Sequence, residues 1–271
     1  MTVSASTTEE ISASLTDNCA LVSGWMVGNR LKLNADKTHL MVVGTGARLR
    51  AQDQGLDVVM DGIRLQESED KAELLLGCYI EPNLKWHKQV NSVLIRLQQR
   101  LNALEKLKNI LPFNRKKIIV EGLFTSVLTY CLPVFGGCDK TEVEALQVMQ
   151  NKAARLVTNS GIRTSRKEIF RQTGWMTVKQ LIFYHTSLCT FRIRSSHEPE
   201  YLAEIMNRNN TRNKIVIPHS RLTLAMNSYC FRGSSQWNRL PEAIRSSSSI
   251  NCFKNQLKTW IHSHVPQFDD A

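Results

Sequence analysis

The chain has 271 residues, 42% of them hydrophobic, and its 35 lysines and arginines against 24 acidic residues give a formal net charge of +11. This length allows a buried core, while the absence of a long apolar run and of a basic-then-apolar start argues against a membrane span and a secretory signal, so we expect an intracellular protein. Seven widely spaced cysteines without a C-x-x-C pair argue against a disulfide scaffold and a zinc knuckle. The positive charge favours a polyanionic partner, because each neutralised phosphate releases condensed counterions.

The chain begins with a predicted helix. Apolar residues recur at helical spacing over 6–29, and Thr7 or Thr8 followed by Glu10 provides the side chains of a capping box. The pair Gly28 and Asn29 is typical of a helix end. We therefore expect one helix across this segment.

Short strands are expected after this helix. Leu40–Val43 is an apolar run that ends at a Gly-Thr-Gly turn, which favours one strand. Asp57–Met60 and Ile63–Leu65 flank an Asp-Gly pair, which supplies the positive φ that a tight hairpin turn needs. Leu74–Ile80 has the pattern of a buried strand, and Glu81–Asn83 then turns the chain.

From Trp86 onward the periodicity is helical. A long amphipathic helix is predicted over 90–107, and Pro112 interrupts it. Further helices are expected over 115–130, 140–158, 167–172, 178–194, 198–206, 227–237 and 250–262. The polar segment 207–214 is a candidate flexible boundary, and the runs 215–217 and 222–224 are expected to pair as a hairpin. The sequence therefore predicts an α+β fold that is mostly helical, with short antiparallel strands.

Four stretches, taken in order, give the chain a family resemblance. They are Val22–Thr38, Leu75–Ile80 with Leu84–Trp86, Leu128–Cys131 with Gln150–Arg155, and Phe231–Gly233 through Trp237–Pro241 to Phe253–Leu257. Together they resemble the C-terminal part of the reverse transcriptases of non-long-terminal-repeat retrotransposons, the LINE-type and jockey-like elements. The LINE-type branch often ends in a Cys/His zinc knuckle, so the absence of one here favours the jockey-like branch.

The resemblance implies a division of the chain into three parts. Residues 1–86 would be a remnant of the palm with a hairpin like the primer grip, residues 87–160 a helical thumb, and residues 161–271 the C-terminal region of the family. Lys37 would lie closest to the phosphates of an incoming nucleotide, although a surface lysine at a strand entrance is an equal alternative.

Two residues of the primer-grip-like hairpin are further candidates. Gly77 would allow a close approach of the backbone to the growing strand. Trp86 could stack on a base, but its helical spacing from Val90 and Val93 favours a place in the core.

The catalytic carboxylates of this family are not recognisable in the sequence. Strand synthesis needs two divalent metals held by carboxylates on adjacent palm strands. The start Met1–Ser4 resembles the residues directly after the family's Asp-Asp pair, so we expect a chain truncated just past the active site. Glu9-Glu10, Glu69-Asp70 and Phe268–Asp270 lack the strand context of such a pair. We therefore assign no catalytic and no metal-binding residue, and expect Mg²⁺ only in an intact parent enzyme.

Basic residues are the remaining functional signal. In the segment 85–117 a single acidic residue, Glu105, stands against nine basic ones. A thumb that follows a template–primer duplex of RNA and DNA needs such a face. The candidate contacts are Lys88, Arg96, Arg100, Lys106, Lys108, Arg115, Lys116 and Lys117. A second group comprises Lys152, Arg155, Arg163, Arg166, Lys167 and Arg171. Simple solubility is the alternative for both groups.

Three hypotheses follow from the sequence. The first is a reverse transcriptase fragment that does not polymerise DNA alone. The second is a sequence-tolerant RNA- or DNA-binding module. The third is a decayed fragment without function, whose unpaired palm strands would expose a sheet edge.

Overall fold

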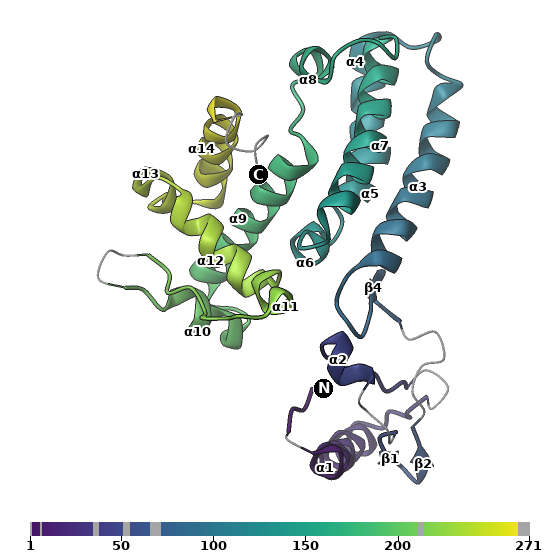
Figure 1. The fold of residues 1–271 in the computed structure, drawn as a ribbon, viewed down its shortest axis with the longest axis vertical. Helices are drawn as coiled ribbons and strands as arrows, with labels where there is room; N and C mark the ends of the chain where they lie inside the picture. Colours follow the sequence, from purple (N-terminus) through teal and green to yellow (C-terminus); the bar gives the residue numbers. More distant parts are fainter. Residues whose placement is uncertain are drawn as a thin grey trace. The chain divides into compact units, whose positions relative to one another are not determined.

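The computed structural model describes residues 2–5, 7–34, 38–50, 55–65, 72–210 and 214–264, which are drawn as a ribbon in Figure 1. The chain divides into two compact units, Met1–Leu84 and Lys85–Ala271. Helices predominate, and the described strands form two separate two-stranded antiparallel sheets. The predicted α+β, mostly helical class is confirmed. None of the helices in the described part of the chain combines the length and apolar character that a membrane crossing requires.

Helix α1, Thr8–Gly28, opens the first unit where the sequence predicted a helix. Its capping box is formed by Thr7, whose hydroxyl accepts the Glu10 N–H at 3.2 Å and whose own N–H donates to the Glu10 carboxylate at 3.3 Å. Two N–H groups that a helix start leaves without an intrahelical partner are satisfied in this way. One side of α1 buries Leu15 and Cys19 in a small core that includes Val58 and Met60.

The Asp-Gly hairpin is confirmed. Strands β1, Val59–Met60, and β2, Ile63–Arg64, pair with Met60 opposite Ile63. The turn residues Asp61 and Gly62 have φ values of 51° and 77°, as a two-residue hairpin turn requires. The Ser23 hydroxyl of α1 donates a hydrogen bond to the Asp61 carboxylate, and this bond ties the turn to the helix.

The predicted strand at Leu40–Val43 is not formed. Only Leu40 takes part in a β-bridge, and its buried side chain joins the core of the first unit. The chain then bends, the Gly44 N–H donates to the Pro82 carbonyl at 3.0 Å, and the short helix α2, Gly46–Arg50, begins. Of the apolar run Leu40–Val43, Leu40 alone is buried, and it is buried without a strand.

The predicted single strand over Leu74–Ile80 is also wrong. The segment is a hairpin of β3, Glu73–Leu75, and β4, Cys78–Ile80, with Leu75 opposite Cys78. Leu76 and Gly77 form the turn at φ values of 47° and 79°, and Leu76 at the tip is 84% exposed. A leucine at positive φ is unusual, so the run of leucines concealed a turn that Gly77 permits.

The second unit begins with a helical hairpin. Helix α3, His87–Glu105, confirms the long amphipathic prediction and packs against α7, Lys140–Thr158. The segment expected as one helix over 115–130 is helical as far as Thr129 but contains a π-helical turn, η2. The connecting elements are α4 (Phe113–Val120), η2 (Glu121–Thr125), α5 (Ser126–Thr129) and α6 (Leu132–Phe135).

Three of the remaining helices, α10, α12 and α14, pack directly against α9, Val178–Ser196. Thr177 and Gln180 form the capping box at its start. Besides α9, the helices after α7 are α8 (Arg166–Thr173), α10 (Glu200–Asn207), α11 (Thr223–Met226), α12 (Tyr229–Arg239), α13 (Glu242–Arg245) and α14 (Ile250–Ser263). The expected hairpin of 215–217 with 222–224 is wrong, since Ile215 bridges Asn209 instead and α11 begins at Thr223.

The second unit has a hydrophobic core of its own, and an aromatic stack lies at its centre. The Phe253 ring of α14 lies 4.4 Å from that of Phe191 on α9 and 5.8 Å from that of Trp237 on α12, measured between centroids. The Phe253 side chain is 0% exposed. Three helices distant in sequence therefore meet on one ring, which the helical periodicity of each segment could not reveal.

We expect Phe253→Ala to reduce the free energy of unfolding by about 3–5 kcal/mol, because it removes a buried ring and leaves a cavity that the surroundings only partly fill. Urea denaturation followed by far-UV circular dichroism measures the change. Asn255→Ala, at an exposed position of the same helix, is the matched control. A loss below about 1 kcal/mol for Phe253→Ala would show that the stack does not hold the unit together.

Candidate nucleic-acid interface

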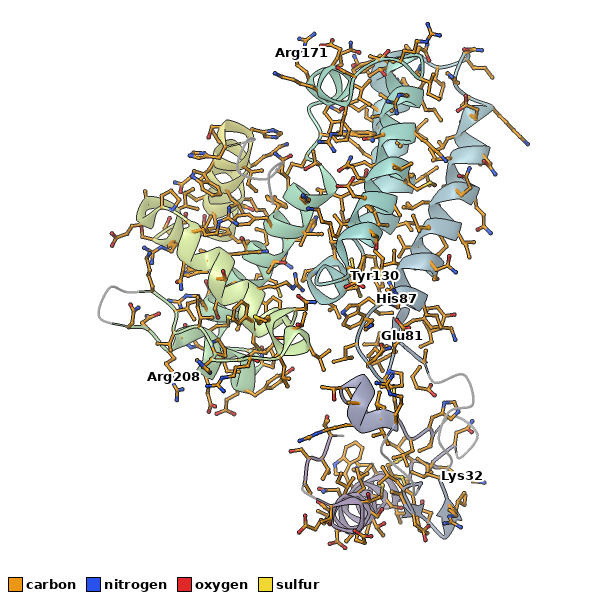
Figure 2. All side chains as sticks on the ribbon, viewed as in Figure 1. Lys32, Glu81, His87, Tyr130, Arg171 and Arg208 are labelled. Carbon is orange, nitrogen blue, oxygen red and sulfur yellow. The ribbon has the colours of Figure 1, made fainter. Side chains whose placement is uncertain are left out.

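The packing of α3 decides where its basic residues point. Its apolar residues Val90, Val93, Leu97, Leu101 and Leu104 are buried, and α3 packs against α7. Polar residues are therefore left on the remaining circumference. In Figure 2 the side chains of α3 extend to both sides of the helix, with His87 labelled at its start.

The basic residues of α3 fall on two lines. Arg96 and Arg100 are four residues apart and share one flank of the helix. Lys88 and Lys106, the latter just past the helix end, are five turns apart and lie about 27 Å from one another along the axis. The cations therefore cover two flanks instead of a single stripe.

Exposure and pairing separate the cations further. Arg100, Lys106 and Arg115 are exposed and make no ion pair within the described residues. Lys108 contacts Glu105 at 3.0 Å, and Lys117 lies 3.9 Å from Glu121. The unpaired cations are the ones that a phosphate would reach without competing with a carboxylate.

Lys116 has a different place from the other candidates. It is 3% exposed, and its ammonium donates to the Lys108 carbonyl at 3.1 Å and to Asn159 Oδ1 at 2.6 Å. Burial, followed by the nearby Lys108, lowers the pKa of the Lys116 ammonium. Asn159 caps the C-terminal end of α7, where the helix dipole is negative and favours a cation. Lys116 therefore connects α4 to α7 and is not accessible to a phosphate.

The burial of Lys116 could have been predicted from the sequence. Lys116 stands four residues before Val120 and eight before Phe124, and all three are buried. A lysine in register with a buried apolar series points inward on the same helix face. The adjacent basic residues Arg115 and Lys117 obscured this signal.

The second basic group is partly neutralised. The Arg171 guanidinium donates to both carboxylate oxygens of Glu168, at 2.8 and 3.0 Å. Hydrogen bonds from Arg171 and Gln172 lower the pKa of Glu168 to about 2. Arg155 donates to the Thr164 carbonyl at 3.2 Å, so these two arginines hold local structure. The other cations of the group, Lys152, Arg163, Arg166 and Lys167, are exposed.

The primer-grip candidates occupy different environments. Gly77 lies in the exposed turn between β3 and β4, in the first unit. Trp86 belongs to the second unit, precedes α3 at a φ of 70° and is 8% exposed. Its burial favours the place in the core over stacking on a base. Lys37 lies outside the described residues.

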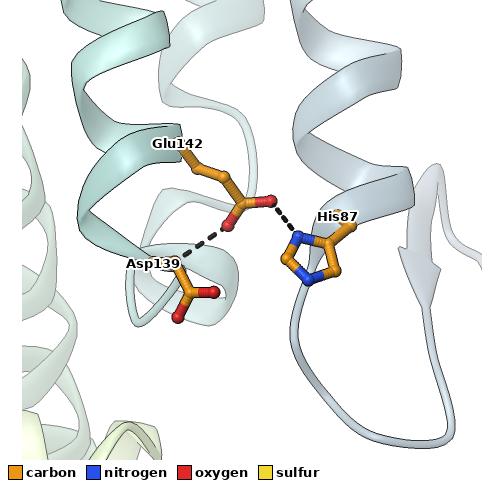
Figure 3. A group of neighbouring side chains, drawn as sticks. All are labelled: His87, Asp139 and Glu142. Atoms are coloured by element: carbon orange, nitrogen blue, oxygen red, sulfur yellow. Dashed lines mark hydrogen bonds and ion pairs between the residues drawn. The ribbon is translucent and has the colours of Figure 1, made fainter.

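Three side chains with metal-ligating atoms meet at the start of two helices, as Figure 3 shows. The His87 Nδ1 lies 2.6 Å from Glu142 Oε1, and the Asp139 N–H donates to Glu142 Oε2 at 3.0 Å. One ligand atom from each residue lies within 4.8 Å of the others. His87 begins α3 and Asp139 precedes α7, so the positive ends of two helix dipoles oppose a cation here.

This cluster does not fit the metal pair of a polymerase. Two Mg²⁺ ions need several carboxylate oxygens on rigid neighbouring strands. In the described ranges this is the one group of three such side chains, and both oxygens of its Glu142 already accept hydrogen bonds or ion pairs. We interpret it as a junction that fastens α3 to α7.

Comparison with known proteins shows that this chain is distantly similar to a transposon polymerase. The chain is 23% identical over 193 residues to "Probable RNA-directed DNA polymerase from transposon BS" of Drosophila melanogaster, a match that covers 69% of this chain and 20% of that protein. The chain thus spans about a fifth of the length of the relative it matches. This supports a relationship to the reverse transcriptases of retrotransposons. No protein-family model and no solved structure matches the chain.

We expect Lys116→Met to reduce the free energy of unfolding by about 1–3 kcal/mol, because it removes the two hydrogen bonds that the charged Lys116 ammonium donates to the Lys108 carbonyl and the Asn159 side chain. Chemical denaturation of the whole chain measures this. The exposed neighbour Arg115→Met is the matched control and should change stability little. Equal effects of the two substitutions would contradict the structural role of Lys116.

Proposed function

We propose that this chain is a reverse-transcriptase-related fragment that contacts a template–primer duplex of RNA and DNA through α3 and α4. The observation that supports this most directly is the set of exposed cations Arg100, Lys106 and Arg115, with the half-buried Arg96 one turn before Arg100 on α3. The net charge of +11 and the similarity to a retrotransposon polymerase support the same partner.

Such contacts would be sequence-tolerant. Guanidinium and ammonium groups bind phosphate oxygens and read no base edge. The distance of about 27 Å along α3 between Lys88 and Lys106 is comparable to one turn of a nucleic-acid duplex. Phosphates within a single turn would therefore meet the helix.

The proposal does not include DNA synthesis by this chain. The sequence has no aspartate pair in the strand context that the resemblance requires, and Phe268–Asp270 lies outside the described residues. The carboxylate cluster at His87 does not fit two Mg²⁺ ions either. A jockey-like parent and a thumb role for α3–α7 are parts of the proposal that rest on the sequence motifs.

We expect Arg96→Gln combined with Arg100→Gln to weaken binding to an RNA–DNA duplex and to reduce the slope of log affinity against log salt by about 2, because two phosphate contacts are lost. Fluorescence anisotropy with a labelled duplex at several salt concentrations measures both quantities.

The control for this experiment removes two exposed arginines elsewhere, Arg208→Gln with Arg221→Gln, and has the same net charge. An equal loss in both double variants would mean that only total charge attracts the duplex. An unchanged affinity and slope in the Arg96/Arg100 variant would contradict the proposed face.

Primer extension on an RNA template with Mg²⁺ and all four deoxynucleotides should yield no product with this chain. A full-length retroelement polymerase in the same assay is the positive control. Sustained extension by the 271-residue chain would show that its own residues supply the metal site.

A further inference from the structure

A pocket of about 330 Å³ lies within the second unit, where α4, η2, α9 and α14 approach the loop between α8 and α9. Its lining includes Lys117, Glu121, Trp175, Met176, Tyr184 and Lys258. Sites for small organic ligands begin at about 300 Å³ and combine apolar walls with a few polar groups. The pocket has this size and this composition.

The aromatic wall is held in place by hydrogen bonds. The Trp175 indole N–H donates to Glu121 Oε1 at 2.8 Å. The next residue, Met176, is buried, and its carbonyl accepts from Gln150 Nε2 at 2.9 Å. Gly174 ends α8 at a φ of 66° and so turns the chain toward this wall. Trp175 is only half-buried, which leaves part of its ring available to a ligand.

The π-helical turn contributes a further part of the lining. Its first and last residues, Glu121 and Thr125, both line the pocket. Single π-helical turns inside α-helices occur frequently at functional sites, because the wider turn displaces side chains from their α-helical positions. The turn is therefore a second observation, independent of the pocket volume, that points to a ligand.

The charges of the lining define the kind of ligand. Lys258 of α14 is exposed, and Lys117 of α4 lies 3.9 Å from Glu121. Lysine attracts an anionic group, whereas the Glu121 carboxylate accepts hydrogen bonds from N–H donors. Trp175 and Tyr184 offer faces on which a flat ring can stack. A flat ring with N–H donors and a phosphate has all the matching groups.

We propose that this pocket binds one nucleotide of a single strand, with the base against Trp175 and Tyr184 and the phosphate toward Lys258. The proposal rests on the proposed function in that nucleic acid is the partner in both. It adds a second type of contact, because the α3 and α4 cations meet phosphates whereas this pocket holds a base. Lys117 belongs to the basic group of α4 and also to the pocket lining.

The test uses guanosine monophosphate and the whole ¹⁵N-labelled chain. The chain has five tryptophans, and Trp175→Phe identifies which indole N–H signal belongs to Trp175. We expect guanosine monophosphate to shift this signal in a saturable manner, with inorganic phosphate and ribose 5-phosphate at least tenfold weaker. A Trp175 signal that stays in place, or that responds equally to inorganic phosphate, would overturn the proposal.

Lysine substitutions on α14 provide the matched variants. Lys258→Ala should weaken guanosine monophosphate binding at least fivefold, whereas Lys254→Ala, one turn earlier and outside the pocket lining, should leave it unchanged. Lys258 is exposed, so its removal should not unfold the chain. Equal effects of the two substitutions would contradict the role of Lys258.

The outcomes for the two proposals can be told apart. The Arg96/Arg100 double variant should lose duplex affinity yet keep the shift at Trp175. Duplex binding without any shift at Trp175 overturns the pocket alone. A saturable shift without salt-dependent duplex binding overturns the α3–α4 face and supports the pocket as an independent nucleotide site.

Discussion

The apolar contact between α3 and α7 is the constraint on which the second unit depends. Once α3 buries Val90, Leu97 and their apolar neighbours, the positions of its cations are decided by helical geometry. The same contact brings the starts of the two helices together, where His87 and Glu142 pair. At the other end, the cap of α7 receives the buried Lys116. The positions of the charged residues in this region thus follow from the packing of the apolar ones.

The sequence predicted most helices because their apolar residues recur every three to four positions. It predicted the β1–β2 hairpin because an Asp-Gly pair between two apolar runs favours a tight two-residue turn. The prediction failed where apolar residues occur outside a regular helix or strand. Leu76 turns the chain with Gly77, Leu40 fills a core without a strand, and Ile215 pairs with Asn209 rather than with a neighbouring run. These outcomes depend on tertiary contacts, which local periodicity does not contain.

Only part of the candidate interface could be predicted from the sequence. Charge density along 85–117 predicted the segment that we propose as the interface, but it could not distinguish an exposed cation such as Arg100 from the buried Lys116. The pocket beside Trp175 was missed altogether, since its walls come from helices far apart in the chain. The similarity to a fifth of a transposon polymerase supports a relationship to that class of protein, while the contacts that we propose rest on burial and pairing in this chain.

The π-helical turn at Glu121–Thr125 also keeps the buried side of this helical segment in phase. Lys116, Val120, Phe124 and Leu128 are all buried, at intervals of four residues. In a regular α-helix each such interval overshoots a full rotation by about 40°, so the last side chain would have drifted by about 120° from the first. A π-helical turn contains more residues than an α-helical one, so each residue rotates the chain by a smaller angle, which cancels part of that drift. Deleting one residue here would therefore misalign everything downstream of it, even if the helix itself became more regular.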